Sequence, residues 1–336
     1  MPVRLPDFLI VGVPKAGTTT LHENLRQHPE VYLPEEKELH YFTYPLLAKA
    51  TAGPGDRRVL ASLCGTLDEY SARFTNVAES LAVGDCSPSY FFFSGCIPRI
   101  KQTLGDAVRS IIVLRDPTSR AYSNWQQLVN SGREVLAFRE ALDAESDRQR
   151  RGWGDFWRYR QHSLYADRLA TFLDAFAREQ LKVIIFEEMI ANPSGTLQDV
   201  YRFLGVNDRF TPRRVETVYN QGGQPRIATL ERLLNSVGST AVAIKDVVPD
   251  GVYRSLRRLK RGLAAGNRAR GEARLDPSLR AELMGFFEAD IRRTERFLGR
   301  SLDLWRDTGH DAAIPAEVVT ESGPCSNAPD VENQTR

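Results

Sequence analysis

The chain has 336 residues, of which 42% are hydrophobic and 26% are charged, a composition that fits one large α/β domain with a core of its own. Its 45 basic and 43 acidic residues leave a formal net charge of only +2, so the overall charge gives no reason to expect a polyanionic partner such as nucleic acid. The four cysteines are scattered and contain no C-x-x-C pair, which argues against a disulfide scaffold or a metal site and favours reduced thiols in the cytoplasm.

The first predicted element is a buried strand at residues 8–11, which leads through a glycine-bounded turn into a helix at 18–27. The apolar stretch around this strand ends at residue 13, so it is too short for a signal peptide or a membrane span of roughly 20 residues. We therefore expect no transmembrane segment and a cytoplasmic location.

Further apolar runs predict strands at residues 81–84, 110–114 and 182–186, of which the first is the weakest. Helical patterns lie between and after them, at residues 116–129, 164–177 and 279–298. Strands that alternate with helices predict an α/β fold: a P-loop-containing, doubly wound parallel sheet flanked by helices, with its ligand at the carboxyl ends of the strands.

The domain organisation that we predict is a lead at residues 1–6, a single domain at 7–305 with a helical C-terminal extension, and a disordered tail at 306–336. Residues 254–274 form a basic block with eight lysines and arginines and one acid. This block is explained by a solvated helix face, by an anionic substrate or by peripheral contact with a membrane. Nothing in the sequence indicates the oligomeric state.

The turn after the first strand has the features of a phosphate-binding loop. Its backbone N–H groups and the following helix N-terminus create a positive field at one point. Gly12 and Gly17 keep the spacing of the nucleotide triphosphatase loop G-x-x-x-x-G-K-[ST], but Thr18 replaces the lysine, which stands inside the turn as Lys15. A plain strand-to-helix connection is the alternative interpretation.

Residues 13–21, Val-Pro-Lys-Ala-Gly-Thr-Thr-Thr-Leu, resemble the 5′-phosphosulfate loop of sulfotransferases that use 3′-phosphoadenosine-5′-phosphosulfate (PAPS), whose pattern is P-K-[AST]-G-[TS]-[TS]. The resemblance implies that Lys15 contacts the oxygen bridging phosphorus and sulfur and stabilises charge on the leaving group. It also implies that the rest of the loop holds the 5′-phosphate without a metal ion, through Ala16, Gly17, Thr18, Thr19 and Thr20.

Residues 115–123 resemble the 3′-phosphate signature of the same family, R-[DN]-P-x-x-R-A-x-S. By that match Arg115 and Ser123 bind the 3′-phosphate, and Arg226, in a segment that resembles a loop closing over the donor, is a further candidate. The alternative is an ordinary helix start, in which Asp116 is the cap and Arg120 pairs with an acid. Two anion sites at neighbouring strand ends suit PAPS and its product, adenosine 3′,5′-bisphosphate.

Residues 37–42, Lys-Glu-Leu-His-Tyr-Phe, resemble the base-containing segment of heparan sulfate sulfotransferases and their bacterial relatives. The match implies that Glu38 is the general base, with His40 beside it or acting as the base instead. The alternative is that these residues are surface charges and a core edge. Residues 84–91 resemble the family's E-K-[ST]-P-x-Y-F, except that Cys86 replaces a lysine that helps to hold acceptor and donor in the animal enzymes.

These resemblances imply a PAPS-dependent sulfotransferase, closest in motif to the heparan sulfate and carbohydrate sulfotransferases. The implied reaction is an in-line displacement of the sulfuryl group onto a hydroxyl or amine, with Glu38 and Lys15 at opposite ends. We expect a small-molecule or glycan acceptor, most simply a carbohydrate or glycolipid. A P-loop kinase using ATP and a catalytically silent nucleotide-binding protein of the same fold are the alternatives.

Overall fold

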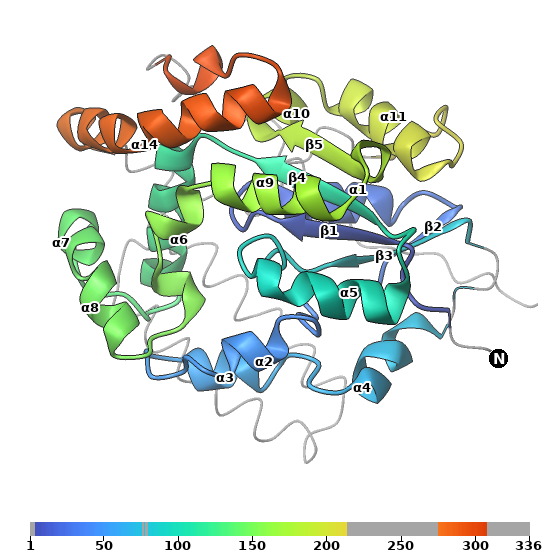
Figure 1. Cartoon of the computed structure of the whole chain (residues 1–336), viewed down its shortest axis with the longest axis horizontal. Helices are drawn as coiled ribbons and strands as arrows, with labels where there is room; N and C mark the ends of the chain where they lie inside the picture. The colour runs from blue at the N-terminus through green and yellow to red at the C-terminus, as the bar shows by residue number, and fades with distance from the viewer. Residues whose placement is uncertain (1–3, 76, 78–79, 214–274, 308–336) are drawn as a thin grey trace, which may run out of the picture.

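The fold is built on a five-stranded parallel sheet, seen in a computed structural model that describes residues 4–75, 77, 80–213 and 275–307 (Figure 1). The strand order is β2-β3-β1-β4-β5. The strands are β1 (Phe8–Gly12), β2 (Val31–Tyr32), β3 (Ala82–Cys86), β4 (Arg109–Leu114) and β5 (Leu181–Ile185). The predicted parallel α/β sheet is therefore confirmed.

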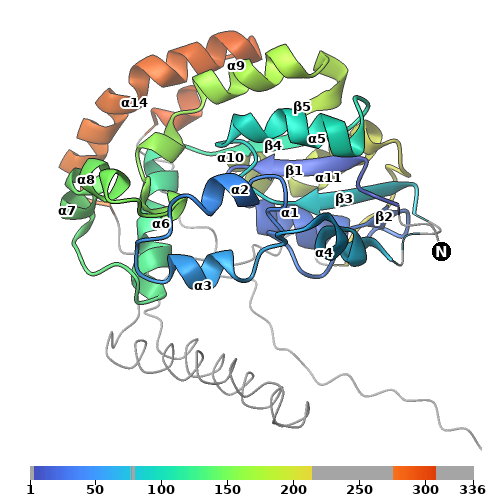
Figure 2. The same ribbon diagram turned by 60° about the horizontal axis from the view of Figure 1, so that its bottom comes forward.

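Helices cover both faces of the sheet, as expected for a doubly wound fold. Helices α5 (Ile97–Leu104) and α9 (Ala166–Ala175) lie on one face, and α1 (Thr18–Leu25) and α11 (Pro193–Leu204) lie on the other (Figures 1 and 2). All residues of β1 and β3 are buried, which explains why the predicted strands appear as continuous apolar runs.

The long crossover between β4 and β5 begins with α6 (Pro117–Asn130). As the sequence predicts, Asp116 is its N-cap and accepts a hydrogen bond from the backbone N–H of Thr118, while Pro117 occupies the first turn. The shorter helices are α2 (Tyr44–Leu47), α3 (Asp56–Leu60), α4 (Leu67–Ser71), α7 (Phe138–Asp143), α8 (Glu145–Arg150) and α10 (Phe186–Ala191). Single 3-10 turns are η1 (Ala72–Phe74), η2 (Ser94–Cys96), η3 (Asp155–Trp157), η4 (Gln161–Ser163), η5 (Arg178–Gln180) and η6 (Asp303–Trp305).

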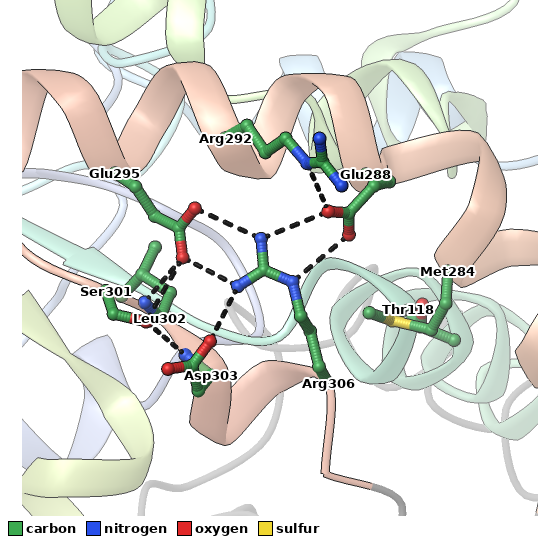
Figure 3. Close-up of polar contacts among 9 residues, drawn as sticks. All are labelled: Thr118, Met284, Glu288, Arg292, Glu295, Ser301, Leu302, Asp303 and Arg306. Carbon is green, nitrogen blue, oxygen red and sulfur yellow. Dashed lines mark hydrogen bonds and ion pairs between the residues drawn. The ribbon is translucent and has the colours of Figure 1, made fainter.

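The predicted C-terminal helix is α14 (Pro277–Leu298), which packs against α6 and α9. The turn after it is held by Arg306, whose guanidinium donates to Glu288, Glu295 and Asp303 (Figure 3). In the same turn the indole N–H of Trp305 donates to Glu187 at 3.0 Å, and Glu187 also accepts the backbone N–H of Asp116 at 2.9 Å. The C-terminal segment therefore fixes the start of α6.

Several elements differ from the sequence prediction. The two-residue strand β2 was not predicted, and α10 begins at Phe186, which the prediction placed at the end of a strand. Within the described residues, no helix has the length and apolarity needed to cross a membrane. Arg226, the basic block 254–274 and residues 308–336 of the predicted tail lie outside the described residues.

Candidate active site

The loop after β1 lies between the ends of β1 and β4. The backbone N–H of Val13 donates to the carbonyl of Val113 at 2.9 Å, and Arg115 Nη1 donates to the carbonyl of Lys15 at 3.0 Å. The segment that carries Lys15 is therefore tied to the strand end that carries Arg115. Both predicted anion-binding residues belong to one site.

Gly17 lets the loop turn into α1. Its φ is +81°, a conformation that side chains disfavour, and an added Cβ would lie 2.6 Å from Cε of Met189 and 2.8 Å from the ring of Phe186. Both neighbours come from α10, which therefore presses against the loop. Thr18, Thr19 and Thr20 form the first turn of α1, where free backbone N–H groups and the helix dipole favour an anion.

Lys15 is half-buried in a cluster of positive charge. Burial and the nearby guanidinium of Arg115 lower the pKa of Lys15 to about 8, and Lys37 and Arg120 act in the same direction. Glu38 is the acidic neighbour that opposes this shift. The structure thus brings Lys15, Arg115 and Glu38 together, although they are up to 100 positions apart in the chain.

Arg115 and Ser123 flank the beginning of α6. The Arg115 side chain stacks on the Phe186 ring at 4.7 Å, and its Nε is buried without a hydrogen-bond partner among the described residues. Ser123 lies on α6 three residues after Arg120, so the two side chains share one face of the helix. Ser123 is half-buried.

Arg120 is the residue here that sequence reasoning left out of the site. It is completely buried, and it donates to Ser163 Oγ and to the carbonyl of Tyr159, each at 2.7 Å. Its third terminal group, Nη1, has no hydrogen-bond partner among the described residues, and it forms no ion pair with any of them. The alternative interpretation, that Arg120 pairs with an acid, is therefore wrong for the described part of the chain.

A buried cation with an unused donor is a candidate anion ligand. Burial lowers the pKa of Arg120 to about 10, and the positive charge of Arg115 contributes to that shift. At pH 7 Arg120 therefore stays charged beside Lys15 and Arg115. The arginine of R-A-x-S in the sequence was the available signal, since it places a second cation shortly after Arg115 in the same motif.

Glu38 and His40 lie on the loop that follows β2. The backbone N–H of Glu38 donates to the carbonyl of Cys86 at 2.7 Å, and that of His40 donates to Ser87 Oγ at 3.0 Å. Both residues are therefore attached to the end of β3, next to β1 and its loop. The motif predicts that Glu38 and His40 lie side by side, and the structure shows that the end of β3 holds both.

The electrostatics of Glu38 and His40 differ. Burial would raise the pKa of Glu38, but Lys37 and Lys15 outweigh it and hold this pKa below its usual value. Lys37 Nζ forms an ion pair with Glu38 Oε1 at 2.7 Å. Burial lowers the pKa of His40 to about 4, so its ring is neutral at pH 7. Its Nδ1 lies 2.6 Å from Ser89 Oγ.

A buried carboxylate, that of Asp85, fixes the loop that carries Glu38 and His40. Asp85 accepts hydrogen bonds from Ser87 Oγ at 2.8 Å, Tyr90 Oη at 2.7 Å and Tyr70 Oη at 3.1 Å. Burial raises the pKa of Asp85 to about 6, although these three bonds favour its charged form. Because Ser87 Oγ uses its proton on Asp85, its lone pair is free to accept the N–H of His40.

The backbone conformation singles out the same residues. Among the described residues, left-handed φ values at positions other than glycine occur at Lys15 (73°), Glu38 (65°) and His40 (51°). Such conformations cost about 1–3 kcal/mol each and persist where the surroundings impose them, often at functional sites. Three residues proposed from motifs are therefore also the strained ones.

The arrangement places a carboxylate and several cations around one loop. Within the described residues, no group of three or more histidine, cysteine or acidic side chains is placed to hold a metal ion. Cys86 is buried, and burial raises the pKa of its thiol beyond the range of a reactive cysteine. Lysine and arginine side chains with spare donors fit a ligand that carries several negative charges.

Comparison with known proteins gives one family. Residues 6–211 match the model described as the sulfotransferase family. A sulfotransferase from Alicyclobacillus acidocaldarius has a similar crystal structure, with 31% sequence identity, a TM-score of 0.71, and coverage of 91% of this chain and all of that one.

Two curated mammalian proteins are also similar in sequence. Heparan sulfate glucosamine 3-O-sulfotransferase 3A1 of Mus musculus is 29% identical over 211 residues, which cover 62% of this chain and 48% of that protein. Carbohydrate sulfotransferase 15 of Rattus norvegicus is 26% identical over 246 residues, which cover 60% of this chain and 44% of that protein. The chain thus spans about half the length of the curated relatives that it matches.

Proposed function

The chain belongs to the sulfotransferase family, and from this premise we propose that it transfers a sulfuryl group from PAPS to a hydroxyl or amine of an acceptor. The observation that carries the proposal is the meeting of Lys15 and Glu38, both in left-handed conformations, in the cation cluster at the strand ends. A carbohydrate or glycolipid is the acceptor class that we propose, supported by the named activities of the two mammalian relatives.

In this proposal the donor is bound by the loop and by three cations, Lys15, Arg115 and Arg120. The N-terminus of α1 and the residues from Ala16 to Thr20 hold the 5′-phosphate, and Arg115 and Ser123 hold the 3′-phosphate. Two features support this fit: the Nε of Arg115 has no hydrogen-bond partner in the part of the chain that the structure describes, and the left-handed Gly17 allows the backbone to approach an anion closely. Arg120 adds a third cation.

The transfer step needs a proton acceptor on one side of sulfur and a cation on the other. Glu38 takes the proton of the acceptor hydroxyl while the oxygen forms its bond to sulfur. The bond between sulfur and the bridging oxygen breaks, and Lys15 stabilises the charge that develops on the departing phosphate. His40 is neutral at pH 7 and therefore remains the alternative base.

Two measurements test the proposed function. Calorimetry with adenosine 3′,5′-bisphosphate should show binding by the wild type, whereas a kinase would prefer ATP with magnesium. Transfer of labelled sulfate from PAPS to a panel of acceptors should occur with the wild type and be lost in Lys15→Ala. Lys101→Ala, on α5 and also partly exposed, is the matched control and should keep its activity. Absence of nucleotide binding by the wild type would refute the proposal.

A further inference from the structure

A cavity of about 30 Å³ lies between α3, the loop before it and the segment 154–156, and His40 forms part of its wall. Arg133, just after α6, pairs with Asp56 at the start of α3, and Figure 2 shows these two helices side by side. The cavity, which we call the α3 cavity, therefore lies between the proposed base loop and the segment that follows α6.

The walls of the α3 cavity combine aliphatic side chains with polar ones. Leu47, Val59, Leu60 and Leu63 line it, and each is half-buried. None of these four belongs to the hydrophobic core of the described residues or packs against it. Aliphatic side chains that line a cavity and stay half-buried are buried further when an apolar group enters.

The polar part of the cavity is rigid and internally neutralised. Asp56 accepts the backbone N–H groups of Gly53 at 2.8 Å and Gly154 at 2.7 Å, and the indole N–H of Trp157 at 3.1 Å. Asp56 also forms an ion pair with Arg133, and the Nε of Arg133 donates to the carbonyl of Pro54 at 2.6 Å. These bonds fix α3 against the opposite wall.

The remaining charged group of the wall is acidic. Burial raises the pKa of Asp155 to about 6, against the opposing effect of Arg158, so Asp155 is mostly charged at pH 7. Among the described residues that line the cavity, every cation is thus already paired. A polyanionic ligand would meet a carboxylate and aliphatic side chains, and no free positive charge would compensate the loss of its hydration.

We infer that the α3 cavity binds an uncharged aliphatic group of the acceptor, so that the acceptor is an amphipathic alcohol or amine, such as a glycolipid, and not a polyanionic glycan. This inference rests on the proposed function and narrows it. The apolar group lies beside His40, and the atom to be sulfated lies at the base loop.

The test compares acceptors that differ only in their apolar group. Methyl, butyl, hexyl and octyl glucosides are supplied with labelled PAPS, and a heparan sulfate oligosaccharide serves as the polyanionic competitor. Because a cavity of about 30 Å³ has room for only one or two methylene groups, we expect kcat/KM to rise about fourfold for each of the first one or two methylenes and then to level off with longer chains. The same glucosides are titrated by calorimetry into protein saturated with adenosine 3′,5′-bisphosphate, which measures binding independently of turnover.

Leu60→Asn places a polar group in the wall without removing a core residue. We expect this variant to bind octyl glucoside about tenfold more weakly while its affinity for adenosine 3′,5′-bisphosphate is unchanged. The matched control is Leu81→Asn, because Leu81 is 58% exposed and does not line the cavity. This control should behave as the wild type.

The two levels of the proposal fail in different ways. If the wild type binds the nucleotide but its binding and turnover of glucosides do not depend on alkyl length, the inference is wrong. It is equally wrong if the heparan oligosaccharide is the better acceptor or if Leu60→Asn changes nothing. Failure to bind the nucleotide at all would instead refute the proposed function.

Discussion

Replacement of Arg120 separates an anion-binding role from a structural one. Arg120 is completely buried, and its charge has no acidic partner within 4 Å among the described residues. A buried charge of this kind costs several kcal/mol of stability in the free protein unless an anion compensates it. We predict that Arg120→Met weakens nucleotide binding but has little effect on the stability of the free protein.

The stability effect is the balance of two changes. Arg120→Met removes two hydrogen bonds from a charged donor, which contribute about 1.5–3 kcal/mol each. It also removes the desolvation penalty of the guanidinium, which is of similar size. No orphan acceptor remains, because Ser163 Oγ already donates to the Tyr159 carbonyl at 3.0 Å. The free energy of unfolding should therefore change by no more than about 2 kcal/mol.

Arg148→Met is the matched control. Arg148 is also a buried arginine, but it forms a two-pronged ion pair with Glu134, at 2.6 and 3.0 Å. Removal of one partner leaves Glu134 buried and should cost about 3–5 kcal/mol. Nucleotide affinity should not change in this variant. Denaturant unfolding of the two variants without nucleotide measures this contrast.

The binding effect is measured by calorimetry with adenosine 3′,5′-bisphosphate. Loss of one charge-assisted hydrogen bond of about 1.5–3 kcal/mol weakens binding roughly 10- to 100-fold. Arg120→Lys should recover part of this loss, because it keeps the charge. Equal affinity of Arg120→Met and the wild type for the nucleotide would show that Arg120 is structural, and the reasoning would be refuted.

Three further predictions concern the loop and the base. Affinity for adenosine 3′,5′-bisphosphate should fall by up to about tenfold per pH unit above pH 8, because Lys15 then loses the charge that the ligand favours; Lys15→Arg should remove this dependence in calorimetry. Glu38→Gln should lower kcat by about 100-fold or more and His40→Ala by less, in the labelled-sulfate assay; a Glu38→Gln variant with most of its rate would make His40 the base. Gly17→Ala should be clearly less stable to denaturant than Gly299→Ala, since both residues have left-handed φ values but only Gly17 has a side chain within 3 Å of the added Cβ.

The sequence predicts the parts of the fold that depend on local patterns. β1, β4 and β5 are apolar runs, and the cap at Asp116 is a local signal, so each was predictable to within a residue or two. Strand β2 has only two residues and no pattern of its own, because it exists through pairing with β3. Such an element depends on tertiary contacts that no local pattern contains.

The candidate site divides in the same way. Lys15, Glu38 and Arg115 stand in recognisable motifs, and the structure brings them together. The sequence does not reveal that Asp85 fixes the His40 loop through Ser87, because that connection runs between two strand ends. The burial of Arg120 and the aliphatic α3 cavity also arise from packing between distant segments, so only a three-dimensional structure exposes them.

The positive charge of the site explains why its loops must be held so firmly. Lys15, Lys37, Arg115 and Arg120 repel one another, and Glu38 is the acidic side chain that opposes them at Lys15. This repulsion and the left-handed residues both raise the energy of the free protein. A ligand with two phosphates would relieve the repulsion on binding. Nucleotide binding should therefore raise the free energy of unfolding by more than its contacts alone would. High salt should reduce this extra stabilisation, because it already screens the repulsion in the free protein.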